Sequence, residues 1–462
     1  CNPKKMLKQN IVLYLRIIHK HKTTFLINLV GLSSGLACVL LVYLWVSDEL
    51  AMDKFHEHDE QLYQVRRNVV NGYGTLATFT SNSSLMLPAL QQEVPEGEMA
   101  VAVYEFGNDA QLETAEKKLS SLGICASEDF FNLFSYPLIK GNAKTILSDV
   151  NSVVISMELA QNLFGELSQA VGQTMVIKKN GLGIKDVFTI TGIFEIPKNS
   201  SENFDFVLPF KTFLKFRNPS YINWYSNSSS MYALLAPNTN ISTFNQKMGD
   251  FVTKRAKFAY PEPVFFSRYS DNYLRGNYEN GKQTGGRITY VILFSIVAVF
   301  VLSIACINFM NLSTARATRR LKEVGVKKAI GAKRKSFGVQ FLFESVLLSF
   351  FSLACAVLLV MLLLPWFNTV ASKELAFAIE GKMLFTLFFV ALLTGLVAGS
   401  YPALYLTKFS AVNVLKGKIY NSLGELLARK GLVIFQFSIS ILLIVAVGVI
   451  YMQLDYLQSK NL

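Results

Sequence analysis

The densest group of reactive side chains in this sequence is a basic run, ARATRRLKEVGVKKAIGAKRKSF, at residues 315–337. It contains nine Lys or Arg residues and a single acid, Glu323. Ammonium and guanidinium groups at this density bind anions, such as an acidic protein surface, anionic lipid headgroups or the phosphates of nucleic acid. The run therefore indicates a binding role.

A metal site is the other chemistry that the residue types suggest. His56 and His58 lie in the segment FHEHDE and could bind a metal ion together with the neighbouring acids Asp53, Glu57 and Asp59. Two His side chains two residues apart point to different faces of a helix, so we expect no metal there. The sequence contains no G-x-x-x-x-G-K-[ST], no G-x-S-x-G, no zincin motif and no C-x-x-C. We therefore expect no catalytic residue, no metal and no cofactor bound by this chain.

The basic run lies between long apolar segments. The chain of 462 residues is 51% hydrophobic and has a formal net charge of +13. A nucleic-acid-binding protein could be this basic but would rarely be this apolar, whereas a membrane protein combines both properties. Five segments are long enough to cross a bilayer, which requires about 20 residues. These expected spans are residues 25–47, 287–310, 339–366, 383–406 and 431–453.

The distribution of charge orients these spans. Residues 48–282 contain 21 Lys or Arg and 26 Asp or Glu, a net charge of −5, so the rest of the chain carries +18. Cations collect on the cytoplasmic side of membrane proteins. We therefore place residues 1–24, 311–338 and 407–430 in the cytoplasm and residues 48–286 and 367–382 outside. This separation explains the basic composition without a nucleic-acid partner.

Residues 48–286 have the pattern of a soluble α+β domain inserted between the first two spans. Apolar and polar residues alternate in QTMVIKK (173–179) and VFTITGIFEI (187–196), as in strands, and NGLG (180–183) supplies a turn between them. Ser156 can cap a short helix whose apolar face contains Leu159, Ala160, Leu163 and Phe164. The predicted fold class is a polytopic α-helical membrane protein with an inserted α+β extracytoplasmic domain.

The basic run itself can form a helix over residues 315–330, because Ala, Arg, Lys, Leu and Glu favour helices. Glu323 can pair with Arg319 and Lys327 at a spacing of four residues, and Gly331 suits a C-cap. Such a helix could dock into a groove on a cytoplasmic partner. From charge alone, the alternative is a basic loop that only sets the topology near anionic lipid.

The segment TARATRRLKEVGVKKAIGAKR resembles the signature of FtsX-like permeases of the MacB type, the membrane subunits of a family of ABC transporters. The segment DELAMDKFHEHDEQLYQVRR (48–67) is similar to the same family. So are three segments of the outer domain, which resemble a MacB-like periplasmic core domain: ASEDFFNLFSYPLIKGN (126–142), VVISMELAQNLFGE (153–166) and FTITGIFEIPKNSSENFDFVLPF (188–210). The resemblance covers nearly the whole chain.

This resemblance implies that the helix after the second span couples to an ATPase subunit. Glu323 and Gly325 are then the central positions, and Val324 and Ile330 would pack on the ATPase. The expected contacts with its acidic rim are Arg319, Lys322, Lys327 and Lys328, with Gly331 at the end of the helix.

The resemblance also implies the partners. A separate cytoplasmic ABC ATPase subunit would bind ATP and Mg²⁺, because this chain lacks the phosphate-binding motif. The permease would form a homodimer or pseudo-dimer, surrounded by lipid in the bacterial inner membrane, with its N-terminus in the cytoplasm and its large domain in the periplasm. A periplasmic adaptor and an outer-membrane protein are further expected partners, and nucleic acid is not.

Transmission of ATPase motion to the periplasmic domain would then serve export of antimicrobial compounds, peptides or lipoproteins. Two alternatives stay open. One is an FtsX-like mechanical or signalling regulator of a periplasmic cell-wall hydrolase. The other is a lipoprotein-releasing subunit resembling LolC or LolE.

The two ends of the sequence carry their own expectations. Within residues 1–24, the segment 11–22 mixes apolar and basic residues at helical spacing, which suits a helix on the membrane surface. The alternative is a basic flank that simply sets the topology, and Met6 is a candidate start residue. The fifth span with its outer tail, residues 454–462, repeats the layout of the first span. We expect it to begin a second half that continues beyond Leu462, and the alternative is a terminal fifth helix with a short outer tail.

Overall fold

The computed structural model describes residues 22–70, 72, 74–107, 110–256, 258, 260–319, 326, 330, 334–377, 381–408 and 423–459. They form two compact units. The membrane unit comprises Cys1–Ser47 and Ile292–Leu462, and the outer unit comprises Asp48–Val291.

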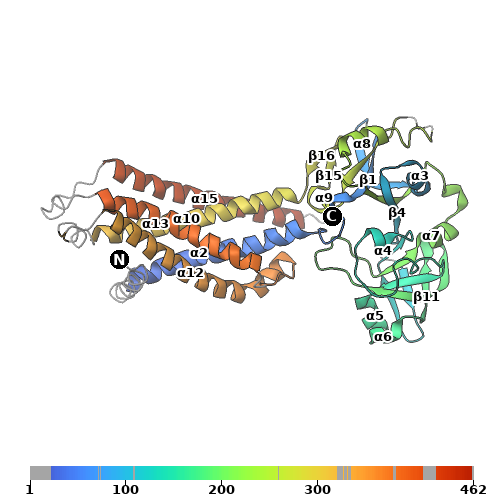
Figure 1. Ribbon diagram of the computed structural model, residues 1–462, viewed down its shortest axis with the longest axis horizontal. Helices are drawn as coiled ribbons and strands as arrows, with labels where there is room; N and C mark the ends of the chain where they lie inside the picture. Colours follow the sequence, from blue (N-terminus) through green and yellow to red (C-terminus); the bar gives the residue numbers. More distant parts are fainter. Residues whose placement is uncertain are drawn as a thin grey trace. The chain divides into compact units, whose positions relative to one another are not determined.

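Each of the five expected spans lies in a long helix, and Figure 1 shows these helices. All five are long and apolar enough to cross a membrane. The helices extend beyond the apolar segments because their polar ends continue the backbone hydrogen bonding. They are α2 (Lys22–Ala51), α10 (Ile288–Arg319), α12 (Arg334–Ala371), α13 (Gly381–Lys408) and α15 (Leu423–Ser459).

Helices α2 and α10 approach each other closely at two glycines of α2. A Cβ atom added at Gly35 would lie 2.6 Å from the Cβ atom of Ala305, and one added at Gly31 would lie 3.2 Å from Nδ2 of Asn308. Small residues allow this close approach, since apolar side chains gain little by moving from lipid to a helix interface. The contact therefore depends on glycine at position 35 above all.

Helices α12 and α13 also pack through small residues. A Cβ atom added at Gly395 would lie 2.7 Å from the Cα atom of Val346. The buried hydroxyl of Ser349 on α12 donates a hydrogen bond of 2.7 Å to the carbonyl of Ala391, which lies one turn before Gly395 on α13. The glycine permits the backbone approach, and the hydrogen bond between the helices fixes their register.

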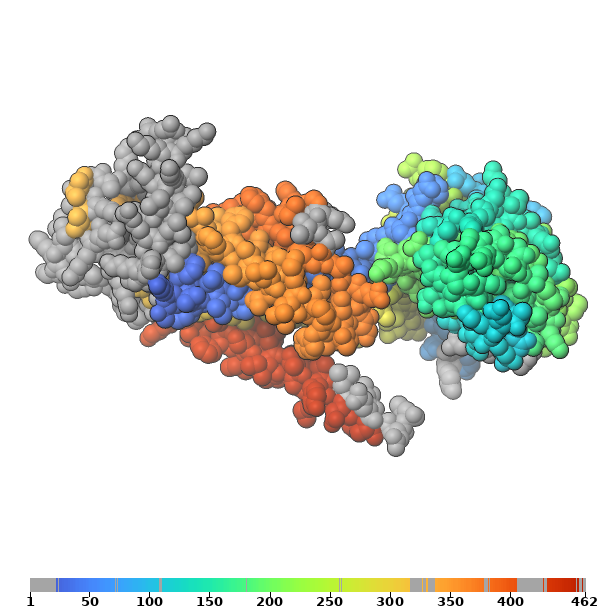
Figure 2. Space-filling model, turned by 90° about the horizontal axis from the view of Figure 1, so that it is seen from below, coloured from blue at the N-terminus to red at the C-terminus, as the bar shows by residue number. Residues whose placement is uncertain are grey.

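Helix α15 differs from the other four because only 6% of its apolar window is buried, against 22% to 39% in the others. Ile434, Ile444 and Val447 are each about two thirds exposed. Figure 2 shows an uncovered face of this helix, in red. Its apolar surface is therefore open to its surroundings along most of its length.

The outer unit is built on a mixed sheet of 14 strands, with a separate hairpin of β15 and β16. The central order is β14-β1-β13-β4-β7-β12-β9-β11-β10-β5-β6. The pairs β7–β12 and β9–β11 are parallel. The strands are β1 (Leu62–Val70), β2 (Leu76–Phe79), β3 (Ser81–Ser83), β4 (Gly97–Glu105), β5 (Ala110–Glu113), β6 (Lys118–Ser121), β7 (Gly123–Ala126), β8 (Leu138–Lys140), β9 (Ser152–Ser156), β10 (Thr174–Lys179), β11 (Ile184–Phe194), β12 (Phe206–Pro209), β13 (Asn227–Leu235), β14 (Val264–Arg268), β15 (Asn277–Glu279) and β16 (Lys282–Gly285).

Short helices accompany the sheet (Figure 1). They are α3 (Met86–Glu93), α4 (Phe130–Leu133), α5 (Met157–Phe164), α6 (Leu167–Ala170), α7 (Phe210–Phe216), α8 (Ile241–Met248) and α9 (Asp271–Arg275). The predicted polytopic helical membrane protein with an inserted α+β domain is therefore confirmed.

Two local predictions for the outer unit are also confirmed. Strands β10 and β11 pair antiparallel, and the predicted turn between them contains a short 3₁₀ helix, Asn180–Leu182. Ser156 caps α5, since its hydroxyl accepts the Leu159 N–H at 3.1 Å. Leu159, Ala160 and Leu163 are buried, and Phe164 packs against the same core.

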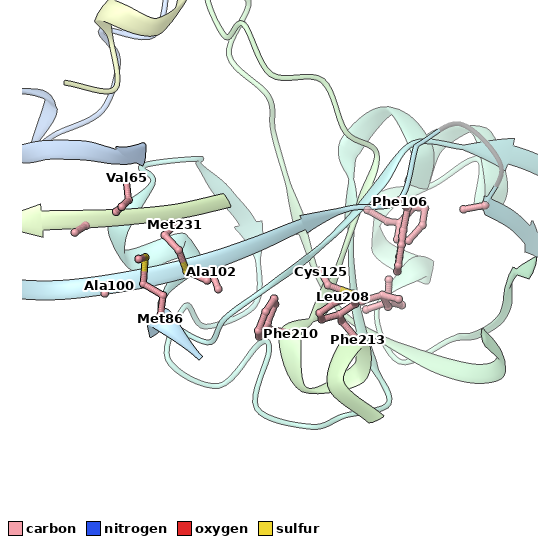
Figure 3. Packing of buried hydrophobic residues seen from close by; sticks show 14 of the residues in the cluster. Val65, Met86, Ala100, Ala102, Phe106, Cys125, Leu208, Phe210, Phe213 and Met231 are labelled. Carbon is pink, nitrogen blue, oxygen red and sulfur yellow. The ribbon is translucent and has the colours of Figure 1, made fainter. Parts of the chain in front are cut away.

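The sheet is buried on both faces. Ala100 and Ala102 of β4 belong to the core cluster drawn in Figure 3, whereas Val101 and Val103 belong to a second cluster on the opposite face. This alternation follows from the strand geometry, in which successive side chains point to opposite faces. Cys125 is fully buried in the first cluster as a free thiol, and burial raises its pKa.

Candidate functional site

The predicted coupling segment begins where α10 leaves the apolar region. The span of α10 ends at Ala315, and the helix continues to Arg319. Val326 is helical, and the Ile330 N–H donates to the Val326 carbonyl at 3.1 Å, which is the i→i+4 spacing of a helix. The predicted site residues Lys322, Glu323, Val324, Gly325, Lys327, Lys328 and Gly331 lie outside the described residues. The coupling helix and the roles of its residues therefore stay predictions.

Beyond the end of α10, the described residues of this segment are Val326 and Ile330, and both have apolar side chains. Ile330 is 81% exposed and Val326 is 48% exposed. Residues four apart lie on the same face of a helix, so both would contribute to one apolar stripe. The predicted site residues include Ile330 but not Val326, although Val326 lies four residues before Ile330.

After the C-terminal end of α2, His56 and His58 lie in a series of turns that leads into a short 3₁₀ helix, Asp59–Gln61. His56 is 4% exposed and lies among the rings of Phe134, Tyr136 and Tyr269, whose centroids are 5.3 to 5.7 Å away. Its Nδ1 accepts the Ser135 N–H at 3.3 Å. In the described part of the chain, no three His, Cys, Asp or Glu side chains gather into a group that could hold a metal ion. His56 therefore has a packing role.

Burial lowers the pKa of His56 from an ordinary value of 6.5 to about 4. The unfolded chain therefore binds a proton at this residue before the folded chain does. We expect a contribution to stability on the order of 3 kcal/mol at neutral pH, which is lost as the pH falls from about 6.5 to about 4. The measurement is the free energy of unfolding of the outer unit against pH, by pulse proteolysis in urea on the full-length chain.

The comparison for this prediction is His56→Asn, which keeps an acceptor near the Ser135 N–H. We expect the difference in the free energy of unfolding between wild type and His56→Asn to shrink as the pH falls from about 6.5 to about 4. His58→Gln is the control, because His58 is exposed and two residues away. Equal pH dependence in wild type and His56→Asn would contradict the prediction.

Asp53, in the same motif, is 1% exposed and has a positive φ of 59°. Burial raises the pKa of its carboxyl, and hydrogen bonds from Ser201 oppose that shift. Sequence reasoning treated Asp53 only as a metal-ligand candidate. Nothing in the local sequence names Ser201 as its partner, because the two are 148 residues apart.

Comparison with known proteins agrees with this arrangement. Residues 25–251 match the family model of a MacB-like periplasmic core domain, and residues 295–411 match that of the FtsX-like permease C-terminal region. Together, these two models cover most of the chain.

The individual relatives have low sequence identity to this chain. A macrolide export ATP-binding/permease protein MacB of Sodalis glossinidius is 21% identical over 428 residues, which are 89% of this chain and 61% of that protein. The protein of the same name from Neisseria meningitidis is 27% identical over 227 residues, 48% of this chain and 32% of that protein. The chain thus spans only part of the length of either relative.

Among solved structures, the periplasmic region of MacB from Actinobacillus actinomycetemcomitans is 12% identical with a TM-score of 0.32, over 45% of this chain and 89% of that one. The assignment depends on the two family models, which match in chain order on either side of the start of α10. The chain belongs to the FtsX-like permeases of the MacB type, the ABC transporter permeases with a MacB-like periplasmic core domain.

Proposed function

We propose that this chain is the permease subunit of an ABC transporter whose ATPase is a separate cytoplasmic chain. In this proposal, closure of two ATPase subunits on ATP and Mg²⁺ moves the segment at residues 315–330. That movement passes through α10 and α2 to the outer unit, which handles cargo outside the membrane. The chain would act as a homodimer or pseudo-dimer in the inner membrane.

The observation that carries the proposal is the insertion of the outer unit, along the chain, between α2 and α10. Helix α2 ends at Ala51, inside the outer unit, and α10 begins at Ile288, also inside it. Both helices are continuous from the membrane unit into these ends, with no break at Ser47 or Ile292. A continuous helix transmits displacement along its axis, and α10 leads directly to the basic segment.

Export is the activity that the relatives suggest. Both named relatives are described as macrolide export proteins. For this chain we propose export or efflux of antimicrobial compounds, peptides or lipoproteins, with a periplasmic adaptor and an outer-membrane protein as further partners.

The test of coupling is co-purification of the full-length chain with the ATPase encoded beside it, followed by ATPase rates in lipid nanodiscs. The variants are Glu323→Lys and Gly325→Trp. We expect each to lower stimulated turnover at least about tenfold, which corresponds to about 1.4 kcal/mol of lost coupling. The physical reason is a reversed charge or a bulky ring inside a docked helix interface.

The matched control is Glu425→Lys, which makes the same charge reversal in another of the expected cytoplasmic segments, residues 407–430, near the start of α15. It should leave turnover unchanged. If Glu323→Lys and Gly325→Trp bind and stimulate the ATPase like wild type, the segment is a basic topology loop and the proposed mechanism fails.

A further inference from the structure

The end of the first span is held by a group of hydrogen bonds to a distant loop. The Asp53 N–H donates to the Asn199 carbonyl at 2.8 Å, and the Asn199 side-chain amide donates to the Ala51 carbonyl at 3.0 Å. The Asp53 carboxylate accepts the N–H of Ser201 at 2.7 Å and also its hydroxyl. We call Ala51, Asp53, Asn199 and Ser201 the exit clamp.

The backbone of Asp53 supports the view that the exit clamp is a constrained element. Its φ of 59° lies in the left-handed region, which is uncommon for a non-glycine residue although Asp adopts it more readily than most, and the surrounding contacts help to hold it there. Asp53 is 1% exposed, so its carboxylate is held by these protein donors and not by bulk water. A flexible linker, by contrast, is rich in Gly and Ser and is solvated.

The loop of the exit clamp continues directly into the sheet. Phe204 is 4% exposed in the core, and Asp205 accepts the Leu122 N–H at 3.1 Å and the Ser121 hydroxyl. Strand β12 follows at once, between β7 and β9 near the middle of the sheet. The exit clamp therefore joins the end of α2 to the centre of the outer unit.

The outer unit is connected to the membrane unit by two segments, the end of α2 and the start of α10, which we call its two connections. A second group of contacts joins these two connections to each other. The Tyr273 hydroxyl donates to Oε1 of Glu49 at 3.1 Å and accepts from Nη1 of Arg287 at 2.8 Å. The Arg287 guanidinium also lies over the Tyr273 ring, 4.6 Å from its centroid. Glu49 is 2% exposed in the last turn of α2, and Arg287 directly precedes α10. We call Glu49, Tyr273 and Arg287 the tyrosine bridge.

The tyrosine bridge is itself anchored to the sheet through Asn272, the residue before Tyr273 in α9. The Asn272 side-chain amide donates to Oε1 of Gln64 at 2.8 Å, and its oxygen accepts from Nη2 of Arg66 at 2.8 Å. Gln64 and Arg66 both lie on β1, and both are buried. Each connection of the outer unit is therefore hydrogen-bonded to a strand or to a loop that leads directly into one.

We propose that Asp53 and Tyr273 are positioning residues, which fasten both connections of the outer unit to its sheet through the exit clamp and the tyrosine bridge. A displacement of α2 or α10 then reaches the sheet and is not absorbed in the connecting segments. This inference rests on the proposed function for the source of the displacement, but the attachment itself can be measured without ATP.

The experiment uses the full-length chain in nanodiscs and the variants Ser201→Ala, Tyr273→Phe and their double variant. These changes remove hydroxyl hydrogen bonds and keep the backbone and the ring. Spin labels at Leu50, in the last turn of α2, and at Lys185, on β11, are both exposed. Electron–electron distance measurements should give a narrow distribution in wild type and one at least about twice as wide in the double variant.

The second measurement is the motion of the outer unit when ATP is added. A fluorophore at Lys144, an exposed residue of the outer unit, is paired with an acceptor on the lipid headgroups, and ATP is added to the complex with the ATPase. We expect the double variant to hydrolyse ATP within about twofold of wild type but to show at least about a threefold smaller ATP-dependent change in energy transfer. A merely structural role would lower hydrolysis and melting temperature together.

The matched control is Ser220→Ala with Tyr221→Phe, which removes the same two hydroxyl types from exposed positions elsewhere in the outer unit. Equal distance widths in wild type and the double variant would overturn the inference whatever the ATPase does. Broader widths without any ATP-dependent change in wild type would overturn the proposed function and leave the attachment established. If the double variant does not fold, the two single variants, compared at equal melting temperature, decide in the same way.

Discussion

Replacement of Gly395 by leucine is expected to break the contact between α12 and α13. A Cβ atom at this position would lie 2.7 Å from the Cα atom of Val346 and 3.2 Å from the Cβ atom of Ser349. The nearest atom belongs to the backbone, so no rotamer change relieves the clash and the helices must separate. The buried hydrogen bond from Ser349 to the Ala391 carbonyl would then be lost as well.

We expect a loss of about 3 kcal/mol or more, at the upper end of overpacking effects, because a backbone approach and a hydrogen bond fail together. The measurement is unfolding of the purified full-length chain by SDS titration, followed by far-ultraviolet circular dichroism. Gly399→Leu should act similarly, since a Cβ atom there would lie 2.6 Å from the Cβ atom of Ser345.

The control is Gly448→Leu in α15, where an added Cβ atom would meet no described atom within 4 Å. Leucine favours helix over glycine, so this variant should be as stable as wild type or slightly more stable. Equal stability of Gly395→Leu and Gly448→Leu would show that α12 and α13 do not pack as closely as described.

Replacement of Phe206 by alanine is expected to cause the largest loss in the outer unit. Phe206 on β12 is fully buried and pairs in parallel register with Gly123 on β7. A Cβ atom at Gly123 would lie 2.1 Å from Cζ of Phe206, so the ring covers the glycine. Truncation leaves a ring-sized cavity in the middle of the sheet, and we expect a loss of about 3–5 kcal/mol.

Gly123→Val should also destabilise the outer unit, because its side chain occupies the space of the ring. In the double variant Gly123→Val with Phe206→Ala, the valine partly fills the cavity, so the combined loss should be smaller than the sum by roughly 0.5–3 kcal/mol. Pulse proteolysis in urea on the full-length chain measures each value.

Phe79→Ala is the matched control for Phe206→Ala, because Phe79 on β2 is 45% exposed. Its loss should be about 1 kcal/mol, well below that of Phe206→Ala, since nearly half of the Phe79 side chain stays in water on folding. Additive losses at Gly123 and Phe206 would refute the account of a ring stacked on the glycine.

Much of the fold follows from local patterns. The five apolar segments predict α2, α10, α12, α13 and α15, because lipid favours a continuous helix wherever about 20 apolar residues follow one another. The β10–β11 hairpin follows from alternation with a period of two, and the start of α5 follows from the Ser156 cap. Helix ends were less predictable, since α10 continues through polar residues to Arg319.

The two candidate sites were less predictable from the sequence than the fold. Glu323 and its neighbours were chosen from charge, spacing and resemblance, and they stay a prediction that the described residues do not test. His56 and His58 suggested a metal by residue type, yet His56 packs among aromatic rings that come from residues 134, 136 and 269. Residue type cannot separate a ligand from a buried ring, because the difference lies in neighbours that are distant in sequence.

The sequence by itself determined the membrane class, the five long apolar helices and the α+β character of the inserted segment. These properties depend on hydropathy, charge and periodicity within a window of about 20 residues. Only the tertiary structure decided that Asp53 meets Ser201, 148 residues away, and that Glu49 meets Tyr273, 224 residues away. Such contacts form when the strands assemble into the sheet and bring distant loops together. No local preference of either residue specifies the other.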